Sequence, residues 1–217
     1  LRIGADVICE KPLVLNPWNV DALIDLEKEY TNRVSTILQL RHHEVILALK
    51  DKINSGPSDK VYEIDLIYIT SRGKWYQTSW KGDESKSGGI ASNIGVHFFD
   101  MLQWIFGPME DFTVIEKSKD TNSGTLKLKR ANVNWFLSIN SNNLPEEIKS
   151  TEKYTYRNIT VDGIAVEFSR GFTDLHTLSY KKILQGKGYG LEDAKNSIEI
   201  VSQIRNKSII TNKPLTH

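Results

Sequence analysis

The sequence has 217 residues, 39% of them hydrophobic, which allows one large buried core or two small ones. Its 28 Lys and Arg residues balance 27 Asp and Glu residues, and the net charge of +1 gives no general attraction to nucleic acid or to a membrane surface. A single cysteine, Cys9, excludes an internal disulfide, and no run of ~20 apolar residues or apolar leader is present, so we expect a cytoplasmic protein without a membrane segment.

The first forty residues have the pattern strand, helix, strand. Residues 4–9 are an apolar run that predicts a buried strand. Asn16-Pro17 predicts the start of a helix that continues to about residue 31, with apolar residues at helical spacing at Trp18, Leu23, Leu26 and Tyr30. Residues 34–40 are strand-like again. A strand, a helix and a second strand in this order form the unit that builds a parallel sheet. Parallel sheets normally have more strands, so we expect these upstream of Leu1, where the sequence begins without a methionine.

The pattern changes after residue 41, and we expect a second domain over residues 42–217. It mixes helices with strands in the order of an α+β unit with an antiparallel sheet. Helices are predicted at 44–54, from Gly88-Gly89 to Gly107-Pro108, at 174–186 and at 191–206, and strands at 61–80, 111–117, 124–140 and 153–168. The last two helices are expected to turn one set of apolar residues inward: Leu175, Ile183, Leu184, Ile198, Val201 and Ile204.

The motif Glu10-Lys11-Pro12 directly follows the first predicted strand. Open α/β sheets bind their ligands at the carboxyl ends of parallel strands, so Lys11 is a candidate for a site in that crevice. An ordinary lysine in a surface loop is the alternative, and three residues alone do not decide between the two.

A second candidate site lies in the helix that follows Ser87-Gly88-Gly89. Asn93, His97 and Asp100 are four and three residues apart, and this spacing places them on one side of a helix. Two glycines at the start of the helix let a ligand approach the backbone closely. The alternative for His97 is a histidine packed in the core.

Metal binding is a rival explanation for His97 and Asp100, with His42 and His43 as further ligands. Neither pair has a recognisable third ligand, and the sequence has no cysteine cluster. The sequence therefore predicts no metal site.

Cations alternate with aromatic side chains between Ser71 and Lys81. This composition suits a nucleotide, because aromatic rings stack on a base and cations meet its phosphates. A platform for single-stranded nucleic acid has the same composition, but the patch is small and the net charge is close to zero. A solvated β-hairpin is the remaining alternative. The candidate residues are Arg72, Lys74, Trp75, Tyr76, Trp80 and Lys81.

The glycine cluster Gly186-Lys187-Gly188-Tyr189-Gly190 invites comparison with a dinucleotide fingerprint. That fingerprint follows a strand, whereas this cluster follows a predicted helix. We therefore expect a helix cap and a turn into the last helix.

The Glu10-Lys11-Pro12 motif, the Gly-Gly-x3-Asn-x-Gly-x-His-x2-Asp run over 88–100 and the order of elements resemble the glucose-fructose oxidoreductase and inositol dehydrogenase family. Asn93 stands where most members have aspartate. The segments RGKWYQTSWKGDESKSGGI (72–90) and FSRGFTDLHT (168–177) resemble the UDP-N-acetylglucosaminuronate 3-dehydrogenases of bacterial O-antigen and lipopolysaccharide synthesis. The resemblance implies that residues 1–41 are the end of a Rossmann NAD-binding domain, and that residues 42–217 form an α+β domain, with a large, mostly antiparallel sheet, for substrate binding and oligomerisation.

The resemblance also implies roles for individual residues in oxidising a secondary alcohol with NAD. Lys11 and His97 are the candidate catalytic residues, and either can serve as the base. The cofactor would meet Glu10, Lys11, Pro12, Gln39 and Arg41. The UDP-sugar would meet Asn93 and the candidates of the aromatic segment, together with Asp174 and His176.

The implied partners are a UDP-sugar, a 2-oxo acid that regenerates the cofactor and further copies of the chain, with no nucleic acid or membrane. Two alternatives remain open: an NAD-dependent glycosidase of the same family and a non-catalytic assembly or ligand-binding domain. A homo-dimer or homo-tetramer is expected because the strand pattern over 124–140 places Trp135 and Leu137 on one face, which we expect no helix to cover.

Overall fold

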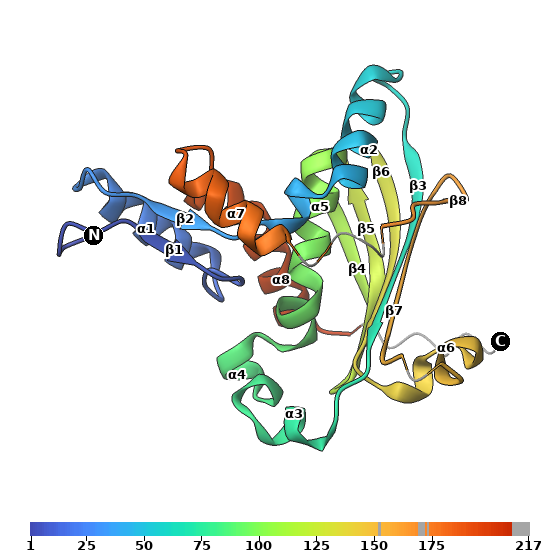
Figure 1. Ribbon diagram of the computed structural model, residues 1–217. Helices are drawn as coiled ribbons and strands as arrows, with labels where there is room; N and C mark the ends of the chain where they lie inside the picture. The colour runs from blue at the N-terminus through green and yellow to red at the C-terminus, as the bar shows by residue number, and fades with distance from the viewer. Residues whose placement is uncertain (152, 169–171, 173, 210–217) are drawn as a thin grey trace.

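The computed structural model describes residues 1–151, 153–168, 172 and 174–209. A small two-stranded sheet with its helix lies at one end, and a six-stranded sheet with helices on one face forms the other (Figure 1). None of the helices in the described ranges is both long and apolar enough to cross a membrane.

The two-stranded sheet confirms the predicted parallel strand, helix, strand order. β1 (Val7–Cys9) pairs in parallel with β2 (Val34–Thr36), and α1 (Pro17–Lys28) connects them with Asn16 as its N-cap. The prediction that β1 is buried is wrong: Val7 is 38% exposed, because β1 has only β2 as a neighbour within the described chain. β2 is also shorter than predicted, and the 3-10 helix η1 (Gln39–His42) follows it.

The large sheet has the strand order β4-β5-β6-β3-β7-β8. β3 and β6 pair in parallel and every other neighbouring pair is antiparallel, which confirms the mostly antiparallel prediction. The predicted strands 124–140 and 153–168 are each two strands joined by a tight turn, and in the second turn Asp162 and Gly163 both have positive φ, as hairpin turns require. The strands are β3 (Tyr62–Thr70), β4 (Met109–Lys117), β5 (Thr121–Leu128), β6 (Ala131–Ser138), β7 (Thr155–Val161) and β8 (Ile164–Ala165).

Residues 74–87 form three short helical turns rather than a strand or hairpin, so the predicted strand is wrong beyond Thr70. The alternation of buried and exposed residues stops there, and Ser79 and Asp83 accept hydrogen bonds from the backbone N–H groups of the turns that they cap. Short turns of helix put both tryptophans of this segment on the surface. The helices are α3 (Lys74–Thr78), η2 (Trp80–Gly82) and α4 (Glu84–Ser87).

The predicted central helix is present, with an irregular first turn. Gly88 and Gly89 have φ of +75° and +74°, a π-helical turn η3 (Ala91–Gly95) follows, and α5 (Val96–Phe106) continues to Gly107 at φ +92°. A Cβ on Gly95 would come within 2.6 Å of Leu137. This close approach sets the start of α5 directly on the large sheet.

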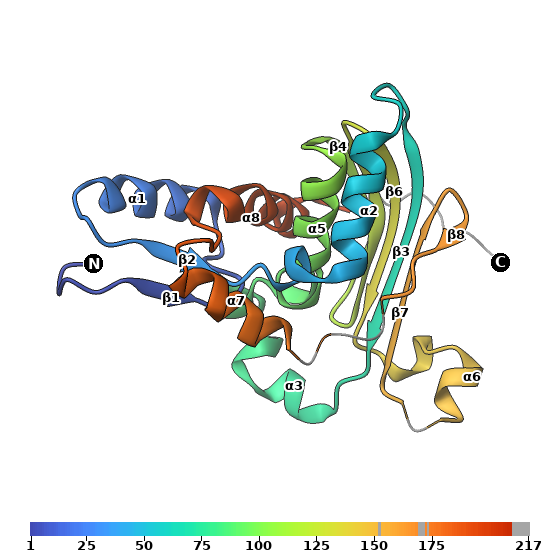
Figure 2. The same ribbon diagram turned by 45° about the horizontal axis from the view of Figure 1, so that its top comes forward.

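Three helices cover one face of the large sheet (Figure 1): α2 (Glu44–Ser55), α5 and α8 (Leu191–Asn206). Figure 2 shows α1 alongside α8, where Lys195 and Asp21 form an ion pair of 2.6 Å. The turn over Gly186–Gly190 joins α7 (Leu175–Leu184) to α8, as predicted. Of the residues predicted to face inward, Leu184 is 81% exposed, because it ends α7 beside that turn.

The face of the large sheet that we expected to be open is instead its core face. The Trp135 ring packs edge-on against Phe99 of α5 at 5.5 Å, and Leu137 is fully buried. The alternation of β6 places Asn134 and Phe136 on the opposite face, away from α2, α5 and α8. The short segments η4 (Ser141–Asn143) and α6 (Glu146–Lys149) follow β6.

Candidate active site

A cavity of about 160 Å³ lies where the end of β1, the 3-10 helix η1, the start of α5 and the large sheet meet. It brings together the two constellations found in the sequence, 82 residues apart. Its lining residues are Lys11, Gln39, Leu40, Tyr68, Arg72, Asn93, Ile94, His97, Phe98, Arg157 and Phe172.

Lys11 projects from the end of β1 into this cavity. Its Nζ donates a hydrogen bond of 2.5 Å to the backbone carbonyl of Asn93 in the π-helical turn. The pKa of Lys11 is lowered to about 8, mainly by burial; Glu10 opposes the shift, and the positive charges of Lys81 and Arg72 add to it. A lysine with this pKa exchanges a proton close to neutral pH.

His97 lies one turn along the helix from Asn93 and lines the same cavity. Burial lowers its pKa well below the usual value, and the positive charges of Lys11, His176 and Arg157 lower it further. The imidazole is therefore neutral at physiological pH and can accept a proton.

The aromatic and cationic segment after β3 lies beside this cavity, and its residue Arg72 contributes to the lining. Lys81 lies 5.8 Å from the ring centres of both Trp75 and Trp80, which are 52% and 57% exposed. The Asn93 side chain donates to the Lys81 carbonyl at 3.3 Å, which ties this segment to the helix.

The other predicted residues do not line this cavity. His176 Nε2 is 3.9 Å from the Glu10 carboxylate, near the end of β1. Lys74 and Asp174 are exposed at the starts of α3 and α7. The Tyr76 side chain is buried and lines two neighbouring cavities rather than this one.

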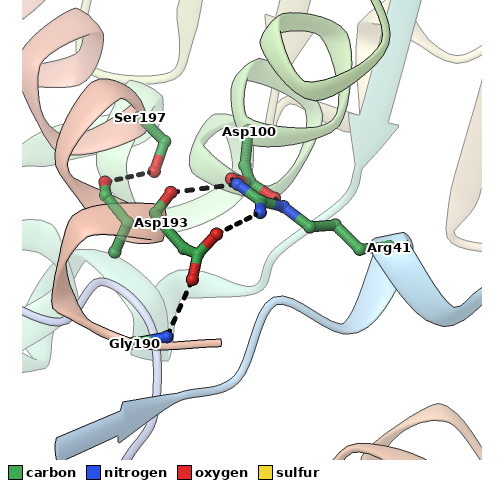
Figure 3. A network of polar contacts seen from close by, with 6 residues as sticks. Arg41, Asp100, Gly190, Asp193 and Ser197 are labelled. Atoms are coloured by element: carbon green, nitrogen blue, oxygen red, sulfur yellow. Dashed lines mark hydrogen bonds and ion pairs between the residues drawn. The ribbon is translucent and has the colours of Figure 1, made fainter. Parts of the chain in front are cut away.

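Asp100 faces away from the cavity, so the prediction that it shares one side with Asn93 and His97 is wrong. Its carboxylate accepts two hydrogen bonds from Arg41, at 3.0 Å and 2.7 Å, and Arg41 also donates to the Asp193 carboxylate at 3.0 Å (Figure 3). Asn93 lies in the π-helical turn η3, which does not have the regular spacing of an α-helix, so the three residues do not share one side.

This buried network joins three elements of the fold. Asp193 also accepts from the backbone N–H of Gly190 at 2.9 Å (Figure 3). The Arg41 guanidinium lies 4.7 Å from the centre of the Tyr189 ring. Burial raises the pKa of Asp100 although Arg41 opposes the shift. Arg41 thus fixes η1 and α8 to the helix that carries His97, and these bonds occupy the guanidinium that we predicted to contact NAD.

Among the charged residues that line the cavity, Arg157 was not singled out from the sequence. It lies on β7, paired in register with Tyr68 of β3, and its guanidinium is 4.1 Å from the Phe172 ring and 5.3 Å from the Tyr68 ring. A single positively charged residue in a strand has no sequence pattern that would mark it as part of a binding site.

The described residues give no support to the alternative that His97, Asp100, His42 and His43 bind a metal. His43 caps α2 by accepting from the Val45 N–H and packs against Phe172. Within the described ranges, no three metal-ligating side chains gather at one point. Residues 169–171 and 173 of the segment 168–177, which contributed to the sequence resemblance, lie outside the described residues.

The chain is similar to proteins of known structure over nearly its full length. The WlbA (WbpB) dehydrogenase from Thermus thermophilus, solved with NAD and alpha-ketoglutarate, is 46% identical over 98% of this chain and 68% of its own, with a TM-score of 0.93. The same enzyme with NAD and UDP-GlcNAcA gives 45% identity over 98% of this chain and 68% of its own, with a TM-score of 0.92. Residues 50–137 match the family model described as oxidoreductase family, C-terminal alpha/beta domain. The chain belongs to this oxidoreductase family.

A curated relative is similar over a shorter stretch. The putative oxidoreductase YteT of Bacillus subtilis is 27% identical over 109 residues, which is 49% of this chain and 26% of that protein. The chain thus matches about a quarter of the length of this curated relative. Two of the most similar solved structures, the Thermus complexes, hold NAD.

Proposed function

We propose that this chain is the catalytic and substrate-binding part of an NAD-dependent dehydrogenase that oxidises the 3-hydroxyl of a UDP-N-acetylglucosaminuronic acid. The observation that carries the proposal is the convergence of Lys11, Asn93 and His97 on one cavity. Similarity to a dehydrogenase solved with NAD and UDP-GlcNAcA supports the substrate class.

In the proposed reaction the alcohol carbon loses a hydride with its electron pair and the hydroxyl loses a proton, which leaves a ketone. NAD, when bound, supplies the acceptor for the hydride. His97, neutral at physiological pH, takes the hydroxyl proton, and the protonated Lys11 ammonium donates a hydrogen bond that stabilises the developing alkoxide. The Asn93 carbonyl holds Lys11 in place for this role.

The residues at the strand ends fit the nicotinamide end of the cofactor. Lys11 and Gln39 follow the two parallel strands and line the same cavity as His97, which is where α/β sheets bind dinucleotides. Glu10 and Pro12 flank this point. Arg41 fits less well, because its donors are taken by Asp100 and Asp193.

The proposal extends to the whole protein. Residues 1–41 would be the end of a Rossmann NAD-binding domain that continues upstream, and residues 42–217 the substrate-binding and oligomerisation domain. A 2-oxo acid would reoxidise the cofactor, as the alpha-ketoglutarate complex of the Thermus enzyme suggests. We place the reaction in the cytoplasm, in the synthesis of surface polysaccharide such as O-antigen.

The test is incubation of a chain extended upstream through a dinucleotide-binding segment with NAD, UDP-N-acetylglucosaminuronic acid and 2-oxoglutarate. We expect a 3-keto nucleotide sugar by mass spectrometry, formed in equal amount with 2-hydroxyglutarate. Release of free UDP or of a cleaved glycoside without a ketone would indicate a glycosidase, and no turnover with any uronic-acid nucleotide sugar would contradict the proposal.

A further inference from the structure

Arg157 packs against two aromatic rings at the wall of the cavity. The centre of its guanidinium lies 4.1 Å from the centre of the Phe172 ring and 5.3 Å from the centre of the Tyr68 ring. Its strand, β7, pairs with β3. Aromatic contacts of this kind fix the plane of a guanidinium while leaving its N–H groups free to donate.

Within the described ranges, Arg157 has no carboxylate partner. No hydrogen bond or ion pair joins it to another described residue, in contrast to Arg41, which is bonded to two aspartates. The cavity lining includes Lys11, Arg72 and Arg157 but no aspartate or glutamate. The described part of this cavity therefore has an excess of positive charge, which a bound anion would compensate.

The three cations differ in what they can do for that anion. Lys11 is bonded to the Asn93 carbonyl beside His97, at the point where the proton is exchanged. Arg72 is exposed at the rim. Arg157 presents a planar donor fork inside, and this geometry matches the two oxygens of a carboxylate.

We propose that Arg157 is the carboxylate receptor of this site, binding the uronate group of the sugar and, in the return reaction, a carboxylate of the 2-oxo acid. This inference rests on the proposed function. Both ligands solved with the Thermus enzyme, UDP-GlcNAcA and alpha-ketoglutarate, carry carboxylates. One receptor serving both would let the two substrates use the same cavity in turn.

The test compares the extended wild-type protein with Arg157→Gln and Arg157→Lys, using UDP-N-acetylglucosaminuronic acid and its uncharged counterpart UDP-N-acetylglucosamine. For Arg157→Gln we expect kcat/KM for the uronic acid to fall about 10- to 100-fold, the scale of a lost charge-assisted pair, with less than about a 3-fold change for the uncharged sugar. Arg157→Lys should recover part of the loss, since it restores the charge without the fork. The matched control is Arg33→Gln, an exposed arginine that does not line the cavity.

Equal losses for both sugars would overturn the inference, because they would place Arg157 on the shared diphosphate or in the fold. Unchanged kinetics with the uronic acid would also overturn it. If the wild type oxidises neither sugar, the proposed function fails, and the receptor is then tested by calorimetric binding of 2-oxoglutarate alone. In that case at least 10-fold weaker binding to Arg157→Gln than to wild type supports the receptor, and equal binding overturns it.

Discussion

Lys11 Nζ donates to the backbone carbonyl of Asn93 at 2.5 Å, which joins the end of the first parallel strand to the π-helical turn before α5. Residues 82 positions apart thus form one site, and the irregular turn is the feature that points the Asn93 carbonyl toward the lysine. π-helical turns are frequent at functional sites for this reason, since they redirect a backbone group out of the helix.

If His97 is the base and Lys11 the protonated donor, kcat/KM should be flat through neutral pH and fall above about pH 8. The sign follows from the two groups, because His97 is already neutral and Lys11 loses its proton through a pKa of about 8. A pH profile of sugar oxidation measures this. A rate that instead rises through pH 8 would make Lys11 the base.

Replacing either residue should lower turnover strongly. We expect Lys11→Met and His97→Ala each to reduce kcat by ~10²-fold or more, the usual contribution of a general acid or base. Asn93→Asp should be milder, because aspartate is the residue common in the family. Steady-state kinetics of the extended protein gives these values, and near-normal kcat in either variant removes that residue from the mechanism.

His97 should also make the stability of the fold depend on pH. Its pKa is lower in the folded state than the ordinary value of 6.5, so the unfolded chain binds more protons as the pH falls through this region. The free energy of unfolding should therefore decrease below pH 6.5, by at most about 1.4 kcal/mol per pH unit from this group, and be unaffected by it above. Urea unfolding of wild type and His97→Gln at pH 5 to 8 tests this, and parallel curves for the two would refute it.

The buried network around Arg41 should be costly to break. Arg41→Ala leaves the Asp100 carboxylate, 3% exposed, without its partner, and we expect a loss of about 3–5 kcal/mol in the free energy of unfolding. Replacing both residues by apolar ones, Arg41→Met with Asp100→Leu, should recover much of it. Lys28→Ala, which breaks the exposed pair with Asp25, is the control and should change little. Equal effects of the two alanine variants would contradict a structural role for the network.

Assembly should use the sheet face opposite to the helices. Phe136 and Ile67 lie side by side in the parallel pair of β6 and β3, among Asn134 and Asp65. We expect light scattering to give a dimer or tetramer, and Phe136→Glu to shift the mass toward the monomer, whereas Tyr180→Glu on α7 should not. A monomeric wild type at micromolar concentration would contradict this.

Much of this architecture was predictable, because helical spacing around Phe98 and Leu102 and the glycines at both ends of α5 are local signals. The segment after Thr70 was not, since its aromatic and charged residues fit a strand as well as the short capped turns that form. The sequence indicated Lys11 and His97 as candidates, but Arg157 required the register of β7 against β3, and the true partner of Asp100 required the packing of η1 and α8 on α5. Both features depend on contacts between segments that are distant in the sequence, and local sequence patterns do not report such contacts.

We expect this 217-residue chain by itself not to bind NAD tightly and not to turn over. A dinucleotide places its pyrophosphate on a glycine-rich turn between a strand and a helix, and the sequence has no such turn: the cluster at Gly186–Gly190 follows α7 instead. The residues that remain, Lys11 and Gln39 among them, would meet only the nicotinamide end.

Titration calorimetry of this chain with NAD, beside the upstream-extended protein, is the decisive comparison. We expect micromolar or tighter binding only in the extended protein. The apolar groove formed by Leu1, Val7, Leu23 and Leu26 should become protected from hydrogen exchange in the same protein, because the added strands would pack against it. Tight binding of NAD by the short chain would mean that the cofactor site lies elsewhere on it.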